Sequence, residues 1–199
     1  MTTNGTDDAF TLLRQAVDLL PGNATAENGL TIADVRRDIE LQEWETVLDM
    51  LIEIADVRPV STAFWEKLAE AARQMMLDRT RRWCQWRAWE VGHGTIRAGL
   101  TLLGTEESGR RNAFDGDGRL RPLWDIGHRT AAGEQDLNVA RLWVEFAPRL
   151  GPGETADVRL EPLQVEQWRH LKPGDVIVMY ETRTAGGIAE IIEVLPPHA

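Results

Sequence analysis

The sequence predicts an α+β protein in which a small helical bundle is followed by an antiparallel β-barrel of six strands. Apolar residues recur at helical spacing up to about residue 90. Beyond Gly92 and Gly94 they form short runs that alternate with polar residues or stop at turns. With 199 residues the chain is long enough for two separate cores, which we expect in a helical domain at 1–91 and a β domain at 92–199.

Four amphipathic helices are expected in the first domain before a fifth, tryptophan-rich segment. The second of them begins after Thr31, with Asp34 three residues further on, as in a capping box. Pro59 ends the third, and Ser61 or Thr62 caps the fourth. The four helices are expected at residues 7–20, 31–39, 43–57 and 61–75.

The third helix carries an apolar face and, opposite to it, an acidic face. The acidic residues follow one another at steps of four, four and three, with no base between them along the helix. They are Glu45, Asp49, Glu53 and Asp56. Two interpretations stay open: a solvated surface, or a binding surface for a basic partner.

The segment DRTRRWCQWRAWEVGHG interleaves arginines with tryptophans just before the expected domain boundary. Trp83, Trp86 and Trp89 are three residues apart, so they form a stripe along one side of a helix. Because large apolar residues are usually buried, we expect this stripe at the junction where the bundle packs on the barrel. The alternative is that Arg81, Arg82 and the tryptophans grip single-stranded nucleic acid by charge and stacking.

Six short strands are expected in the second domain, and closing them into a barrel would leave no free edges. They are placed at residues 96–103, 120–126, 139–146, 155–160, 176–181 and 187–194. In the third strand, Phe146 is expected mainly on the same side as Leu142 and Val144. Gly174 is expected in a turn, and Gly186 and Gly187 in a tight hairpin.

Composition excludes several classes of protein. The net charge of −10 is shared by both halves of the chain, which is not typical of a generic nucleic-acid binder. The single cysteine, Cys84, excludes an intramolecular disulfide and fits a reducing compartment. No apolar run approaches membrane-spanning length and no export signal is evident, so we expect a cytoplasmic protein without membrane contact.

No catalytic or cofactor motif stands out. The sequence contains no G-x-x-x-x-G-K-[ST] loop, so no nucleoside triphosphate is expected. Glu106 and Glu107 are adjacent and would point to opposite faces of a strand, and the run beginning at Asp115 is expected to be a turn rather than a calcium loop. We therefore expect no enzyme activity, no cofactor and no metal. The histidines lack the spacing of a zinc site: His93, His128, His170 and His198.

The β segments share an order of motifs with a known barrel. A strand at 96–103 is followed by TEESGRR, then by RP at Arg121, and later by LKPGD and two final strands. In this order they resemble the third, C-terminal β-barrel domain of bacterial elongation factor Tu. That domain meets the T stem of aminoacyl-tRNA, so the resemblance implies Gly109, Arg110 and Arg121 as positions for an RNA contact. The RNA-binding hypothesis adds the neighbouring Arg111 to these positions. The GTPase domain of that family has no counterpart here.

The helical segment at 32–77 carries an acidic helix and a restart of the form PVSTAFW. In this it resembles small immunity proteins of the MafI type from bacterial polymorphic-toxin systems. An acidic surface would suit an inhibitor that covers a basic cleft. We expect a non-enzymatic binding protein, toxin-neutralising or regulatory, for a basic protein partner. The alternative is a translation-linked tRNA- or RNA-binding module without GTPase activity.

Overall fold

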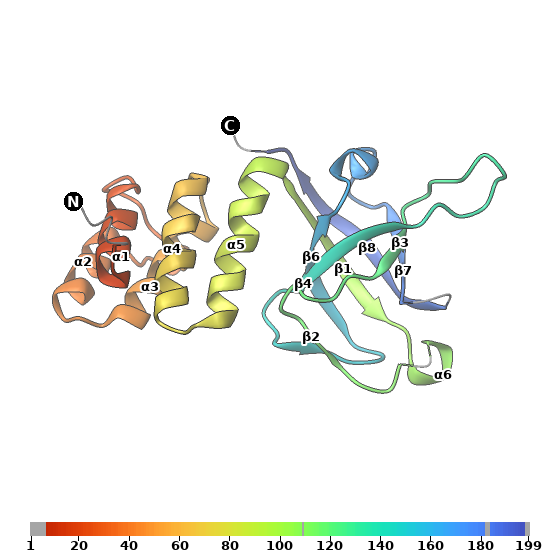
Figure 1. Ribbon diagram of the computed structural model, residues 1–199, viewed down its shortest axis with the longest axis horizontal. Coiled ribbons are helices and arrows are strands. Elements are labelled where there is room, and N and C mark those ends of the chain that lie inside the picture. The colour runs from red at the N-terminus through yellow and green to blue at the C-terminus, as the bar shows by residue number, and fades with distance from the viewer. Residues whose placement is uncertain (1–6, 109, 182–183, 198–199) are drawn as a thin grey trace, which may run out of the picture. The chain divides into compact units, whose positions relative to one another are not determined.

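A computed structural model describes residues 7–108, 110–181 and 184–197 (Figure 1). The chain divides into two compact units, one that ends at Gly92 and one that spans His93–Pro197. The first is helical and the second contains a closed antiparallel β-barrel, which confirms the predicted fold class. No helix in the described part of the chain is long and apolar enough to cross a membrane.

Five helices build the described part of the first unit, and side chains cap three of them. The Asp8 carboxylate accepts a hydrogen bond from the Thr11 amide at 2.7 Å. Thr31 and Asp34 form the expected capping box, and the Ser61 side chain accepts from the Phe64 amide. The helices are α1 (Ala9–Asp18), α2 (Ile32–Glu40), α3 (Trp44–Asp56), α4 (Thr62–Gln74) and α5 (Asp78–His93).

The core of the helical unit lies where the apolar faces of these helices meet. Phe64 and Trp65 of α4 are fully buried and contact each other edge to face, with ring centroids 5.4 Å apart. Leu13 of α1 and Leu48 and Leu51 of α3 complete the centre of this core. Burying each of these side chains stabilises the fold by about 1.5–3 kcal/mol.

Six strands form the closed barrel in the order β1-β6-β4-β3-β7-β8, and every neighbouring pair is antiparallel. Strand β8 pairs with β1 to close it, from Thr95↔Leu195 to Leu102↔Gly187. The six predicted strands are thereby confirmed. They are β1 (Thr95–Leu102), β3 (Leu123–Asp125), β4 (Asn138–Val144), β6 (Thr155–Pro162), β7 (Val176–Tyr180) and β8 (Ala185–Leu195).

Four short elements lie between these strands in the described chain and were not expected from the sequence. Strand β2 (Phe114–Asp115) pairs with β5 (Arg149–Leu150), and a single 3-10 turn, η1, spans Val165–Trp168. This turn places Trp168 in the barrel core, edge to face with Trp124 at 6.3 Å. Helix α6 (Thr105–Ser108) contains Glu106 and Glu107, so these two residues are not on a strand.

Two glycines expected in a hairpin turn lie instead inside a strand. Gly186 and Gly187 belong to β8, and Gly187 pairs with Leu102 of β1 and Met179 of β7. A Cβ on Gly187 would come within 3.0 Å of both the Leu100 side chain and the Thr101 carbonyl oxygen. These glycines are needed because strands approach closely, not because a turn requires them. Gly174 does occupy the expected turn, with φ of 88°.

Phe146 departs from its predicted place on the barrel-facing side of the third strand. Strand β4 ends at Val144, and Phe146 follows it with φ of 58° and with 95% of its surface exposed. Hydrogen bonds hold the backbone on either side, from the Glu145 amide to the Asp157 carbonyl and from the Gly116 amide to the Pro148 carbonyl. The left-handed residue turns the chain outward, so the alternation of faces stops before Phe146.

Candidate functional site

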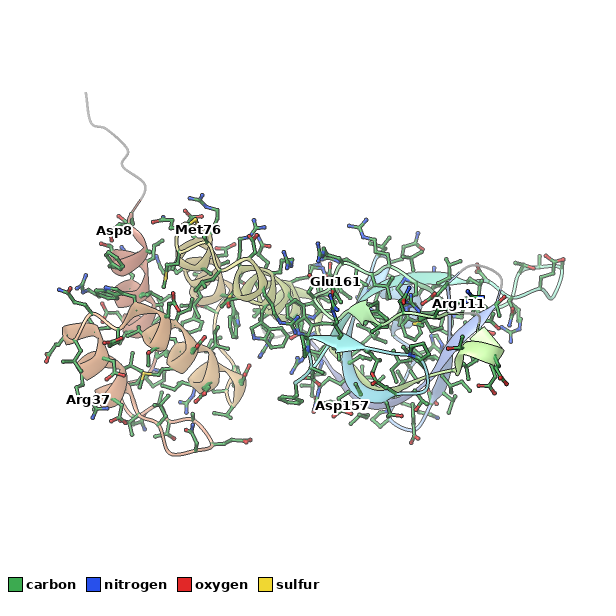
Figure 2. All side chains as sticks on the ribbon, turned by 90° about the horizontal axis from the view of Figure 1, so that it is seen from below. Asp8, Arg37, Met76, Arg111, Asp157 and Glu161 are labelled. Atoms are coloured by element: carbon green, nitrogen blue, oxygen red, sulfur yellow. The ribbon has the colours of Figure 1, made fainter. Side chains whose placement is uncertain are left out.

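The four acidic residues singled out on the third helix all lie on the solvent side of α3. Helix α3 buries Val47, Leu48 and Leu51, among others, and this fixes which face points outward. Each of the four acids is exposed. We call the set of Glu45, Asp49, Glu53 and Asp56 the acidic face of α3. Figure 2 shows the side chains of the helical unit as sticks.

The carboxylates on this face affect one another. The pKa of Asp49 is raised, first because neighbouring atoms displace part of its water and then because Glu53 and Glu45 carry like charges. Neither Glu45 nor Asp49 has a hydrogen-bond or ion-pair partner within the described ranges. Glu53 accepts a hydrogen bond from the Asn28 amide at 2.9 Å, which neutralises no charge. The charges of these three acids are therefore uncompensated.

Asp56 differs from the other three because a base reaches it from another helix. The guanidinium of Arg87 on α5 forms an ion pair with the Asp56 carboxylate. Arg87 also contacts Glu90 at 3.0 Å and lies over the rings of Trp65 and Trp83, at 4.7 and 5.3 Å from their centroids. No sequence pattern indicated this pair, since the two residues are 31 positions apart in the chain. The uncompensated acids are thus Glu45, Asp49 and Glu53.

An aromatic cluster begins at the start of the same helix. Phe10 of α1 stacks on Trp44, with ring centroids 4.4 Å apart, and Phe10 remains 41% exposed. The guanidinium of Arg14 lies over the Trp44 ring at 4.9 Å. Leu41, just before α3, is also exposed. Trp44 packs against the core of the helical unit. Sequence reasoning missed this cluster, because the contact with Phe10 depends on how α1 packs.

The tryptophan stripe lies on α5 as expected. Trp86 is buried, and its indole N–H donates to the Glu90 carboxylate at 3.1 Å. Trp83 and Trp89 are half-buried. The proposed position of the stripe at a junction between bundle and barrel stays a prediction. Of the two arginines named with it, Arg81 lies 3.6 Å from Asp78 and Arg82 is half-buried.

The arginines named for an RNA contact lie in different surroundings. The Nε of Arg110 donates to Glu181 at 2.6 Å and its Nη1 to the Asn112 carbonyl, while the guanidinium lies over Phe114. Arg110 is thus held by its own barrel. Arg111 and Arg121 are exposed and form no ion pair or hydrogen bond with the rest of the described chain. Gly109 lies outside the described residues.

Two of the dispersed histidines meet in the fold. The rings of His128 and His170 stack with centroids 4.6 Å apart, and the two ring nitrogens of His170 lie 3.0 and 2.8 Å from the carbonyl oxygens of Gln167 and Ile126. Nevertheless, no group of three or more His, Cys, Asp or Glu side chains in the described residues could hold a metal ion. His93 is exposed and His198 lies outside the described residues.

A buried carboxylate anchors the long loop between β3 and β4. Asp125 accepts hydrogen bonds from Arg129, from the Gly127 amide and from Gln135, at 2.9, 2.9 and 2.8 Å. Burial by itself would raise the pKa of Asp125, but these hydrogen bonds together outweigh it and the pKa is lowered. Asp125 therefore fixes the base of a loop whose exposed tip extends away from the barrel (Figure 1).

No protein-family model matches this sequence, and no match is found among curated proteins. The function is therefore inferred from the surfaces described above.

Proposed function

We propose that this chain is a non-enzymatic binding protein, toxin-neutralising or regulatory, and that the acidic face of α3 meets a basic surface on a protein partner. The observation that carries this proposal is the set of adjacent, uncompensated carboxylates at Glu45, Asp49 and Glu53. Like charges four residues apart destabilise a helix. A basic partner would remove that repulsion on binding, so the free energy given up in the isolated chain would favour the complex.

The aromatic cluster at the start of α3 supports the same proposal. Interfaces place tryptophan, tyrosine and arginine at their energetically dominant positions and charged residues around them. The stacked pair of Phe10 and Trp44 with Arg14 would supply the apolar anchor. The acids that follow would then set orientation and the rate of association. The likeness of this segment to MafI-type immunity proteins points to a toxin as the partner.

The test compares the wild-type chain with the double variant Asp49→Lys and Glu53→Lys. Proteins that the immobilised wild-type chain captures from its native cell are purified, and their association is measured in titrations at two salt concentrations. We expect the partner to associate faster with the wild-type chain than with the double variant, and the wild-type association rate to fall as salt rises. The affinity of the double variant for the partner should be at least tenfold lower. Glu134→Lys, on the exposed loop after β3, is the matched control. Equal binding by the double variant and the wild-type chain would reject the proposal.

A second candidate is a translation-linked tRNA- or RNA-binding module of the type of the elongation factor Tu C-terminal domain, without GTPase activity. The observation in its favour is that Arg111 and Arg121 are exposed and carry no acidic partner within the described chain. Binding of bulk tRNA should then weaken as salt rises, with a slope of about −0.7 to −0.9 per phosphate contact. Arg111→Ala with Arg121→Ala should reduce that slope, while Arg119→Ala, which removes a base paired with Asp117, should not. No shift of tRNA at low salt would reject this candidate.

A further inference from the structure

The outer side of the barrel carries an exposed apolar face on its last two strands. Ala189 and Ile191 of β8 point into the core, so Ile188, Glu190 and Ile192 point outward. Val176 of β7 is 63% exposed, and Ile188 and Ile192 are each 45% exposed. Val178 pairs with Ile188, which joins the two strands into one surface. We call the surface of Val176, Val178, Ile188, Glu190 and Ile192 the β7–β8 face.

One carboxylate lies in the middle of the β7–β8 face. Glu190 pairs with Val176 on one side and with Gly99 of β1 on the other, and Ile188 and Ile192 lie two residues before and after it. Gly99 has no side chain, so the surface beside Glu190 is open; a Cβ there would touch only the end of Ile192, at 3.8 Å. Glu190 is exposed and has no hydrogen-bond or ion-pair partner within 7–108, 110–181 and 184–197. The face thus combines apolar contact area with one unpaired negative charge.

We propose that the β7–β8 face binds a protein segment that presents one lysine or arginine between apolar residues. The apolar residues would cover Val176, Ile188 and Ile192, and the long stem of the basic side chain would lie along them while its charged end reached Glu190. A wholly apolar partner does not fit, because it would bury the Glu190 carboxylate without a cation. The charge at the centre of the face therefore determines the chemistry of the partner.

Two other modes of binding do not suit this face. A symmetric pair of copies packed through it would bring two Glu190 side chains together, and like charges in an interface oppose association. Addition of a strand needs a free sheet edge, whereas β8 is paired with β7 on one side and β1 on the other. Recognition must therefore use the outward side chains. The proposal is independent of the acidic face of α3, which lies in the other unit.

The test selects peptides from a phage-displayed library of random 12-residue sequences on the intact wild-type protein. Selected peptides are synthesised and their affinities are measured by fluorescence anisotropy. We expect peptides with a lysine or arginine flanked by apolar residues, and at least tenfold weaker binding to Glu190→Gln and to the double variant Ile188→Ser with Ile192→Ser. Glu190→Lys should bind the same peptides after their base is changed to glutamate. Glu134→Gln, on the exposed loop after β3, should bind as the wild type does.

Four results would overturn the proposal: no enrichment of peptides, enriched peptides without a base, affinities that Glu190→Gln leaves unchanged, or a stable dimer in sedimentation that the isoleucine double variant abolishes. Circular dichroism checks that each variant is folded. Should the isoleucine double variant fail to fold, Glu190→Gln and the Glu190→Lys charge exchange decide the matter, since a change at this exposed side chain leaves the core intact.

Discussion

Replacing Asp49 by asparagine should stabilise the helical unit at neutral pH. Asp49 lies four residues from both Glu45 and Glu53, and its raised pKa reflects the surrounding atoms and these two carboxylates. Each like-charge pair at this spacing costs about 0.2–0.5 kcal/mol. Removing both pairs should therefore raise the free energy of unfolding by about 0.4–1 kcal/mol at pH 7.

The gain should depend on pH in a defined direction. Because the pKa of Asp49 is raised in the folded state, the folded chain binds more protons than the unfolded chain between the ordinary pKa of an aspartate and the raised one. The penalty of the ionised Asp49 is thus fully present above the folded pKa and absent below the unfolded one. The advantage of Asp49→Asn at pH 7 should disappear at about pH 3.

Urea denaturation followed by circular dichroism at 222 nm measures this effect, since the long helices all begin in the first unit. Glu27→Gln, an exposed acid in the loop before α2, is the control and should leave the midpoint unchanged at both pH values. If Asp49→Asn gave no stabilisation at pH 7, or the same stabilisation at pH 3, the repulsion inferred on the acidic face of α3 would be refuted.

Four further predictions concern single residues. Gly187→Ala should lower the free energy of unfolding by about 1–3 kcal/mol, because its Cβ would meet a side chain and a backbone oxygen of β1 at 3.0 Å; Gly99→Ala, where space is open, should be nearly neutral in the same denaturation series. Phe146→Gly should raise the free energy of unfolding by up to about 1 kcal/mol, because glycine adopts the left-handed conformation of this residue without strain. An equal increase for Phe146→Ala would contradict this reason. Trp86→Ala should lower the free energy of unfolding by about 3–5 kcal/mol and give separate unfolding transitions for the two units in calorimetry. An unchanged melting temperature with lost binding of single-stranded nucleic acid would contradict the junction prediction. Asp125→Asn should lower the free energy of unfolding by about 1.5–3 kcal/mol at pH 7, because it weakens the hydrogen bonds that the carboxylate accepts. Because the pKa of Asp125 is lowered by folding, that stabilisation is present above the unfolded pKa and lost as pH falls through the folded one, so thermal melts of variant and wild type should converge in strong acid.

Local signals in the sequence were enough to predict most elements of this fold. The capping box of Thr31 and Asp34 involves residues three apart, so the sequence contains all of it. The six strands followed from alternation and turn residues, and their closure from the cost of free edges. The prediction that Gly186 and Gly187 form a hairpin turn was wrong, because turn preferences consider only residues that are close in sequence. The requirement at Gly187 comes from a strand that lies far away in the chain.

The candidate site was less predictable because its decisive contacts join distant residues. The exposure of Glu45, Asp49 and Glu53 followed from helical periodicity. The neutralisation of Asp56 by Arg87 did not, since no sequence pattern indicates which arginine of α5 faces α3. The stack of Phe10 on Trp44 depends in the same way on tertiary packing. Pairs of this kind need homologous sequences or coordinates to be found.

The pairing of the first and last strands of the barrel also bears on the order in which the chain folds. Strand β1 is the first and β8 the last strand of this unit, and they close the cylinder through Thr95 and Leu195. Contacts between residues so far apart carry a large loop-closure entropy and are typical of slowly folding proteins. On the ribosome, β8 is synthesised after every other strand of the barrel, so the cylinder stays open until this strand has emerged. Strand β1 lacks its β8 neighbour during that interval, whereas β6 can already pair with its other edge.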